Sequence, residues 1–202
     1  MIWIVFEGPD GAGKSTVIEG VKEELEKRGF RVFVTHEPSS GPIGKLIREW
    51  ALKLRVNPPH LYALLFVADR YYHYYNVVKP ALEQGYIVLQ ERYKESTIAY
   101  QAAMGLDIEW LEELNKYLPE PDLTIVLDLD VEELVERIAQ RGKKQEVFEN
   151  REFLCKVREI YLKRAREKGY PILNTKDTNK TKEKVLEYIL DLLGRRNLLS
   201  TT

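Results

Sequence analysis

The sequence predicts an α/β fold of three layers, αβα, in which helices cover both faces of a mostly parallel sheet of about five strands. Short apolar runs rich in β-branched residues alternate along the chain with longer segments whose apolar residues recur at helical spacing. A glycine-rich loop also joins the first apolar run directly to the first helical segment. Because 202 residues suit one well-buried domain, we expect a single domain over residues 1–202.

The first two strands and their helices come before residue 55. Residues 2–6 and 31–35 are runs of β-branched and aromatic residues, which predict strands. The segment GKSTVIEGVKEELEKRG between them has helical spacing and ends at Gly29, a typical helix stop. The prolines and glycine of HEPSSGP then predict a loop before a helix over residues 43–54. A loop at the end of a parallel strand is a common place for active-site groups.

The middle of the chain continues this alternation. A long helix is predicted from residue 57 to residue 84, with a break near Pro80 because proline lacks the backbone N–H that a helix needs. Residues 86–90 and 123–129 are short, nearly uninterrupted apolar runs, as expected of strands covered on both faces. Two more helices are predicted between these strands, over residues 96–104 and 108–118.

The last third of the chain begins with a predicted helix over residues 131–140, for which Asp130 is the expected N-cap. The polar segment RGKKQEVFEN, residues 141–150, predicts a loop. The remaining predicted elements are a helix over residues 151–168, a short edge strand over residues 171–173 and a final helix over residues 180–193.

Composition excludes several classes of function. Lys and Arg number 31 against 32 for Asp and Glu, so net charge does not favour nucleic acid or an acidic membrane. The one cysteine, Cys155, excludes an internal disulfide, and the three histidines are too scattered to suggest a zinc site. The chain starts at Met1 without a basic leader or a membrane-spanning apolar run. We therefore expect a cytoplasmic protein with neither nucleic acid nor membrane as a partner.

The glycine-rich loop carries the motif of a phosphate cradle. Gly8, Gly13, Lys14 and Ser15 fit G-x-x-x-x-G-K-[ST] between a predicted strand and a predicted helix. In such a loop, backbone N–H groups face the phosphates, the lysine neutralises the β and γ oxygens, and the hydroxyl can bind Mg²⁺. The alternative, a turn that only joins strand to helix, does not account for the lysine and serine. The motif thus predicts ATP or GTP with Mg²⁺.

The cradle alone does not separate a kinase from a GTPase, an ATPase or a nucleotide switch. A GTPase would need D-x-x-G after a middle strand and N-K-x-D before a late helix. The sequence Asn174-Thr175-Lys176-Asp177 has its lysine one position late, and the D-x-x-G matches lie inside the cradle and in the last helix. The sequence therefore does not support a GTPase.

A kinase for a phosphorylated acceptor needs arginines beyond the cradle, since it must hold two polyanions together. Phe66 and Arg70 are spaced i, i+4, so a ring that stacks on a base and a guanidinium that reaches its edge would share one helix face. The alternative is a core phenylalanine and a surface arginine. Glu91 and Arg92 follow a strand, where a carboxylate can organise Mg²⁺ or accept a proton. A surface ion pair is the alternative for these two.

At this point the chain resembles the thymidylate kinase family. That family's motifs are F-E-G-x-D-G-x-G-K-[ST]-T, T-R-E-P, L-L-F-x-A-D-R, D-R-Y-x-x-S-x-x-A-Y-Q, P-D-L-T-x-x-L-D-x-D and E-R-I-x-x-R. The matching runs here, in the same order, are FEGPDGAGKST, THEP, LLFVADR, ERYKESTIAYQ, PDLTIVLDLD and ERIAQR. Together they cover most of residues 1–141, which is far more specific than the cradle alone. The resemblance implies the P-loop kinase fold with a short lid.

The resemblance implies roles for the residues around the phosphates and the sugar. Lys14, Arg92, Glu91 and Asp10 would be catalytic. Arg92 would bind the acceptor phosphate, and Glu91 would take the place of the family's aspartate near Mg²⁺ beside Ser15. Asp10 would approach the 3′-hydroxyl of the acceptor. Tyr100 would exclude a 2′-hydroxyl and so select deoxyribose. The implied ATP-binding residues are Gly8, Pro9, Asp10, Gly11, Ala12, Gly13, Lys14, Ser15, Thr16 and Arg137.

The resemblance also implies how the acceptor base is read. Phe66 would stack on thymine while Arg70 bonds its edge. Thr97 and Gln101 fall where the family reads the base edge. The implied reaction is the ATP- and Mg²⁺-dependent phosphorylation of dTMP to dTDP, in nucleotide biosynthesis, by a homodimer. The alternatives are another P-loop small-molecule or nucleoside monophosphate kinase and a nucleotide-binding switch without turnover.

Three positions depart from the family pattern. Glu91 replaces aspartate, which lengthens the carboxylate by a methylene and changes the expected metal or water geometry. His36 stands where T-R-E-P has arginine, which weakens any grip of that loop on the acceptor phosphate. Gly11 stands where one branch of the family has an arginine that reaches the transferring phosphate. In the other branch the lid supplies that charge.

The lid is expected at about residues 141–150. Its candidates are Arg141, which would be catalytic, Lys143, Lys144 and Glu149. A solvated charged loop is the alternative. For Asp128 we prefer a role in shaping and capping the following helix to a metal site. The run Tyr71–Tyr75 puts rings on every side of a helix, which favours packing or the dimer interface that the resemblance implies over ligand binding.

Overall fold

The computed structural model describes residues 1–52, 58–140 and 151–196. Its sheet has five parallel strands in the order β2-β3-β1-β4-β5. This confirms the predicted α/β class, and the strand bounds fall within a residue or so of those expected from the sequence. The strands are β1 (Trp3–Glu7), β2 (Val32–His36), β3 (Ile87–Glu91), β4 (Leu123–Asp128) and β5 (Ile172–Asn174).

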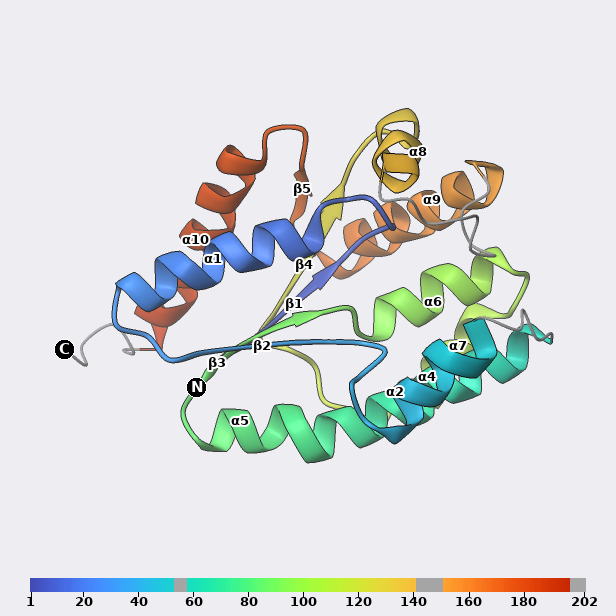
Figure 1. The fold of residues 1–202 in the computed structure, drawn as a ribbon, viewed down its shortest axis with the longest axis horizontal. Helices are drawn as coiled ribbons and strands as arrows, with labels where there is room; N and C mark the ends of the chain where they lie inside the picture. Colours follow the sequence, from blue (N-terminus) through green and yellow to red (C-terminus); the bar gives the residue numbers. More distant parts are fainter. Residues whose placement is uncertain (53–57, 141–150, 197–202) are drawn as a thin grey trace.

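Helices cover both faces of this sheet (Figure 1). Residues of α1 and α10 pack on one face, and residues of α4, α5, α6 and α9 pack on the other. The longer helices of the described residues are α1 (Lys14–Lys27), α4 (Pro59–His73), α6 (Lys94–Ala103), α7 (Ile108–Asn115), α8 (Val131–Gln140), α9 (Arg151–Lys168) and α10 (Thr178–Arg195). The short helical segments are α2 (Pro42–Leu46), η1 (Ile47–Ala51), η2 (Tyr74–Val78) and α5 (Lys79–Glu83).

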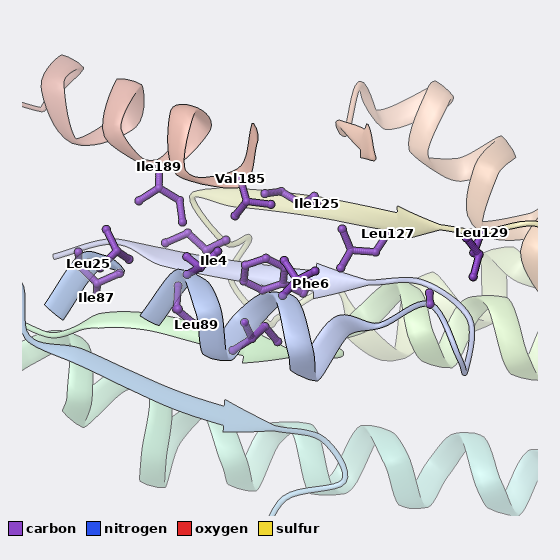
Figure 2. Close-up of a cluster of buried hydrophobic side chains, with 14 of the residues drawn as sticks. Ile4, Phe6, Leu25, Ile87, Leu89, Ile125, Leu127, Leu129, Val185 and Ile189 are labelled. Atoms are coloured by element: carbon purple, nitrogen blue, oxygen red, sulfur yellow. The ribbon is translucent and has the colours of Figure 1, made fainter. Parts of the chain in front are cut away.

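The side chains of β1 alternate between the two faces. Ile4 and Phe6 pack with α1 and α10, whereas Trp3 and Val5 pack on the opposite side. Figure 2 shows Ile4 and Phe6 among apolar side chains of the two neighbouring strands and of α10. Every residue of β1 is buried, which is why this strand reads as an uninterrupted apolar run up to Glu7.

The long helix predicted to break near Pro80 departs from α-helical geometry one turn earlier. α4 ends at His73, and the chain continues through the π-helical turn η2 before α5 begins at Lys79. Pro80 has no N–H for the preceding turn and its ring crowds the carbonyl four residues back, so a wider turn before it relieves both problems. The predicted start of this helix at residue 57 lies outside the described residues.

Strand register brings the chemistry to one edge of the sheet. Phe6 lies opposite Glu91 of β3 and Ile125 of β4, so the segments that follow these three strands leave the sheet at the same edge. Carboxyl ends of parallel strands form the usual ligand crevice of such sheets. Among the described helices, none has the length and apolar character needed to span a membrane.

Candidate active site

The cradle loop runs from β1 into α1, and its shape depends on glycine. Gly8 has φ 133°, and a Cβ there would lie 2.1 Å from the backbone oxygen of Leu127. Gly13, at φ 79°, is the N-cap of α1. Both backbone conformations are rare for residues with side chains. A glycine-rich loop that leads into a helix N-terminus in this way can present backbone N–H groups to an anion.

Lys14 lies inside this loop. Its Nζ donates to the backbone oxygens of Gly8 and Pro9, each at 3.0 Å, and lies 3.9 Å from a carboxylate oxygen of Glu91. Burial, followed by the nearby charge of Arg92, lowers the pKa of Lys14 to about 8. A phosphate group placed in the loop would favour the charged amine, because an opposite charge at short range opposes that shift.

Glu91 meets the first hydroxyl of α1. The Ser15 hydroxyl donates to Glu91 Oε2 at 2.7 Å. Burial raises the pKa of Glu91, but the charges of Lys14 and Arg92 outweigh it, so the pKa lies below the ordinary value and the group is an anion at neutral pH. Two oxygen ligands side by side at a phosphate loop suit Mg²⁺, which takes one or two protein oxygens and completes its shell with phosphates and water.

Arg92 sits directly after β3 with φ 70°, the single positive φ at a non-glycine residue within the described ranges. Its backbone N–H donates to the oxygen of Phe6, which ties the turn to the end of β1. Its Nη2 donates to Asp10 Oδ1 at 2.5 Å. The Tyr100 hydroxyl donates to Asp10 Oδ2 at 2.9 Å and accepts from the Asp10 N–H at 3.0 Å. The structure thus brings together Asp10, Arg92 and Tyr100, three of the residues for which the resemblance implies contacts with the acceptor.

Arg70 is buried rather than on the surface, so the alternative of a surface arginine is wrong. It is 1% exposed, and its Nε donates to Glu37 at 2.8 Å. Its other donors reach Asn115 Oδ1, at 2.9 Å, and the backbone oxygen of Tyr93 and the hydroxyl of Thr97, both at 2.8 Å. These four bonds use four of the five N–H groups of a guanidinium. Among the described residues, no hydrogen bond uses the second hydrogen of Nη1.

The other residues predicted to contact the base are Phe66 on α4 and Gln101 on α6. Phe66 is half-buried beside the cluster that contains Tyr100. Gln101 is buried on α6, one turn after Thr97, and its Oε1 has no hydrogen-bond partner among the described residues. A buried amide oxygen without a donor is costly. A ligand N–H in this space would satisfy it.

Arg137 and Asp128 lie on the α8 side of the cradle. Arg137 Nη2 donates to the Thr175 backbone oxygen at 3.2 Å. Its Nη1 lies close to Gly13, since a Cβ added to that glycine would be 3.3 Å from it. Asp128 accepts two bonds from Arg158 of α9, at 2.7 and 2.9 Å, so it pairs with α9, and its role in shaping and capping the following helix stays a prediction. The lid candidates Arg141, Lys143, Lys144 and Glu149 lie outside the described residues, and His36 is exposed at the end of β2.

Sequence reasoning did not single out several buried residues that support this site. Glu7, Glu37 and Ser96 do belong to the motifs FEG, THEP and ERYKES, so a signal for them was present. Tyr161 and Asn115 lie outside every motif. Only the folded structure brings the Tyr161 hydroxyl to Arg92, at 3.3 Å, and Asn115 to Arg70.

The sequence profile of the thymidylate kinase family matches residues 6–189 of the chain.

The chain belongs to the thymidylate kinase family.

Relatives agree with this placement in the thymidylate kinase family. A probable thymidylate kinase of Pyrobaculum aerophilum is 50% identical over 195 residues, which cover 96% of this chain and 97% of the relative. A probable thymidylate kinase of Thermococcus kodakarensis is 41% identical, and the matched residues make up 96% of this chain and 99% of that relative. The crystal structure of thymidylate kinase from Ehrlichia chaffeensis superposes with a TM-score of 0.76 at 26% identity, covering 93% and 98% of the two chains. The family's reaction is phosphoryl transfer to dTMP, so the chain is a phosphotransferase of this class.

Proposed function

We propose that the chain, as one domain over residues 1–202, transfers the γ-phosphoryl group of ATP to the 5′-phosphate of dTMP and releases ADP and dTDP. The observation that carries this proposal is the junction of two anion sites. In the cradle, Lys14 lies near the carboxylate of Glu91, and beside the cradle the guanidinium of Arg92 pairs with Asp10. Both pairs lie at the same edge of the sheet. Two polyanions held side by side are what a nucleotide kinase needs.

On the donor side, we propose that the cradle binds the phosphates of ATP. Lys14 would neutralise the β and γ oxygens, and Arg137, which lies against Gly13, would flank the nucleotide. Ser15 and Glu91 would hold Mg²⁺ with the phosphates and water. When bound, that ion would neutralise charge on the β- and γ-phosphates. The proposed ATP-binding residues remain Gly8, Pro9, Asp10, Gly11, Ala12, Gly13, Lys14, Ser15, Thr16 and Arg137.

On the acceptor side, we propose that Arg92 binds the phosphate and Asp10 the 3′-hydroxyl of dTMP. Phe66 would stack on the base, and the remaining Nη1 hydrogen of Arg70 would donate to a base carbonyl. The buried Oε1 of Gln101 would accept from a base N–H. A base with both a carbonyl and an adjacent N–H on one edge, as in thymine, satisfies both groups.

The chemistry then needs no covalent enzyme intermediate. The acceptor phosphate is already a nucleophile, so the protein's part is to position both nucleotides and neutralise charge as it develops. Glu91, ionised beside Ser15, and Asp10, held by Arg92, keep the two basic groups in place before substrates arrive. Arg141, Lys143 and Lys144 remain the proposed lid residues for the transferring phosphate.

A rival from a different class is a nucleotide switch without turnover. With ATP and Mg²⁺ present, we expect ADP release to depend on added dTMP. If ADP release were absent with dTMP, or equally fast without it, the kinase proposal would fail. Within the described part of the chain, Gln101 Oε1 has no hydrogen-bond partner and Arg70 has one N–H without an acceptor, which favours a second ligand that a switch does not require.

Tyr100 offers a test of deoxyribose selection. Replacing Tyr100 with alanine should lower the preference for dTMP over its ribose analogue by about tenfold, since loss of the ring removes a steric clash with a 2′-hydroxyl. Tyr100→Phe keeps the ring and loses the hydroxyl that bonds to Asp10, so it should keep the preference. The measurement is kcat/KM for both acceptors. Equal preference in the wild type and Tyr100→Ala would remove Tyr100 from this role.

We also propose a homodimer formed through α4. Leu64 and Tyr75, at spacing i, i+11 along α4 and η2, are 49% and 52% exposed. Leu46 and Trp50 of α2 and η1 are also partly exposed, and α2 packs against α4. An apolar surface of this kind suits a second copy of the chain.

Leu64→Glu should convert this dimer to a monomer, because it would bury an unpaired charge at the contact. Sedimentation should then give a mass near 23.6 kDa for the variant and twice that mass for the wild type. Tyr117→Glu, at an exposed position that follows α7, is the matched control and should stay dimeric. A wild-type monomer would contradict the proposal.

A further inference from the structure

A buried carboxylate lies directly before the cradle and takes no part in the proposed reaction. Glu7 is the last residue of β1 and is fully buried. Its Oε1 accepts from the backbone N–H groups of Tyr93, at 2.8 Å, and Ser96, at 3.2 Å. Its Oε2 accepts from the hydroxyls of Ser96, at 2.5 Å, and Tyr161, at 3.2 Å. Glu7 is therefore held by four donors from two other elements.

The same two hydroxyls also accept from Arg92. Its Nη1 donates to Ser96 Oγ at 3.0 Å and lies 3.3 Å from the Tyr161 hydroxyl. Each hydroxyl can donate to Glu7 while it accepts from Arg92, since a hydroxyl has one hydrogen and two lone pairs. The two hydroxyls are 2.8 Å apart. They connect the buried carboxyl group of Glu7 to the guanidinium of Arg92, and both hydroxyls lie between the two groups.

Among the described residues, the hydrogen-bond partners of this guanidinium lie at Nη1 and at one hydrogen of Nη2. Nη1 faces Ser96 and Tyr161 and also the backbone oxygen of Gly8, at 3.4 Å, and one hydrogen of Nη2 goes to Asp10. Within the described ranges, no hydrogen bond involves Nε of Arg92. The Nε–H and the second Nη2 hydrogen form the fork with which an arginine binds a phosphate through two bonds.

We infer that Tyr161 is a positioning residue for Arg92: its hydroxyl, together with that of Ser96, fixes Nη1 so that the opposite edge of the guanidinium meets the acceptor phosphate. The inference rests on the proposed function, in which Arg92 binds that phosphate. Tyr161 reaches the site from α9 and is 1% exposed. Burial raises the pKa of its hydroxyl well above the ordinary value, so it stays a neutral donor and acceptor at any working pH.

The alternative is that Tyr161 only stabilises the packing of α9 against α6. The two accounts differ in which ligand they affect. A positioning role acts through the phosphate on Arg92, so it changes the affinity for dTMP but not for thymidine, which has no phosphate. If Tyr161 had only a packing role, its loss would weaken the binding of both ligands or of neither.

Isothermal titration of dTMP and of thymidine tests this. Tyr161→Phe should raise the Kd for dTMP about tenfold, the cost of a hydrogen bond to a charged group, and should change the Kd for thymidine less than about twofold. Ser96→Ala should give the same pattern by removing the neighbouring hydroxyl. Tyr62→Phe removes another buried hydroxyl, which donates to the Ala51 oxygen at 3.0 Å, and should leave both affinities unchanged.

Equal weakening of dTMP and thymidine in Tyr161→Phe, or no change in either, would overturn the inference. If Tyr161→Phe failed to fold, Ser96→Ala would decide by the same comparison. If the wild type bound dTMP no more tightly than thymidine, the phosphate role of Arg92 would itself be wrong, and the proposed function would fail together with this inference.

Discussion

Replacing Lys14 with alanine is expected to lower kcat for dTMP phosphorylation by at least about a hundredfold, because the transferring phosphate loses its principal positive partner. Lys14 is 4% exposed, and the loop oxygens that surround its amine would then face the triphosphate without a cation. Steady-state kinetics with saturating dTMP and Mg²⁺ measure the loss.

Lys22→Ala is the matched control, since Lys22 lies on the same helix, has a side chain that is 31% exposed, and pairs with the more exposed Glu19. It should keep wild-type kcat, because an exposed ion pair of this kind contributes little. Thermal unfolding of both variants separates loss of activity from loss of fold. If Lys14→Ala kept more than half of the wild-type kcat, the cradle would not be the site of transfer.

Arg92→Ala is expected to lower kcat/KM for dTMP by a factor on the order of a hundred or more, because a charge-assisted fork to the acceptor phosphate is lost and Asp10 is left without its cation. The affinity for ATP should change by only a few-fold, since Arg92 faces the acceptor side of the cradle. Arg92→Lys should recover part of the loss, because a lysine supplies the charge but not the planar fork.

The control for Arg92 is Arg31→Ala, at an arginine that lies over the ring of Tyr86 near the opposite end of the sheet. It should have wild-type kcat/KM. Unchanged kcat/KM for dTMP in Arg92→Ala would show that this arginine does not bind the acceptor phosphate, even if the protein is a dTMP kinase.

The fold could be predicted because the signals for it are local. The five apolar runs and the helical segments between them dictate parallel strands joined by crossovers. Parallel pairing then brings the loop after Phe6 beside Glu91 whatever the order of the outer strands. The position of the site thus followed from the pattern, while the order of the strands did not.

Burial of polar residues could not be predicted in the same way. Phe66 and Arg70 were expected on one helix face, but a surface arginine was equally consistent with the spacing. Arg70 is buried because Glu37 and Asn115, from two distant segments, accept its hydrogens. Such a set of partners exists only after the chain has folded.

Tyr161 shows the same limit more strongly. It belongs to no motif, and its helical segment shows only the ordinary spacing of a packed helix. Its hydroxyl gains a role because α9 packs against α6 and places it between Glu7 and Arg92. The π-helical turn before Pro80 likewise depends on how the helix meets its neighbours, although the proline was a visible cause.

The most direct test of the central claim is a comparison of acceptors with the purified protein, ATP and Mg²⁺. ADP release is measured with dTMP, dUMP, dCMP, dAMP, dGMP and thymidine, each over a range of concentrations. A dTMP kinase should show its highest kcat/KM with dTMP. A protein that shows no preference for dTMP, or that acts only on the nucleoside, would contradict the account.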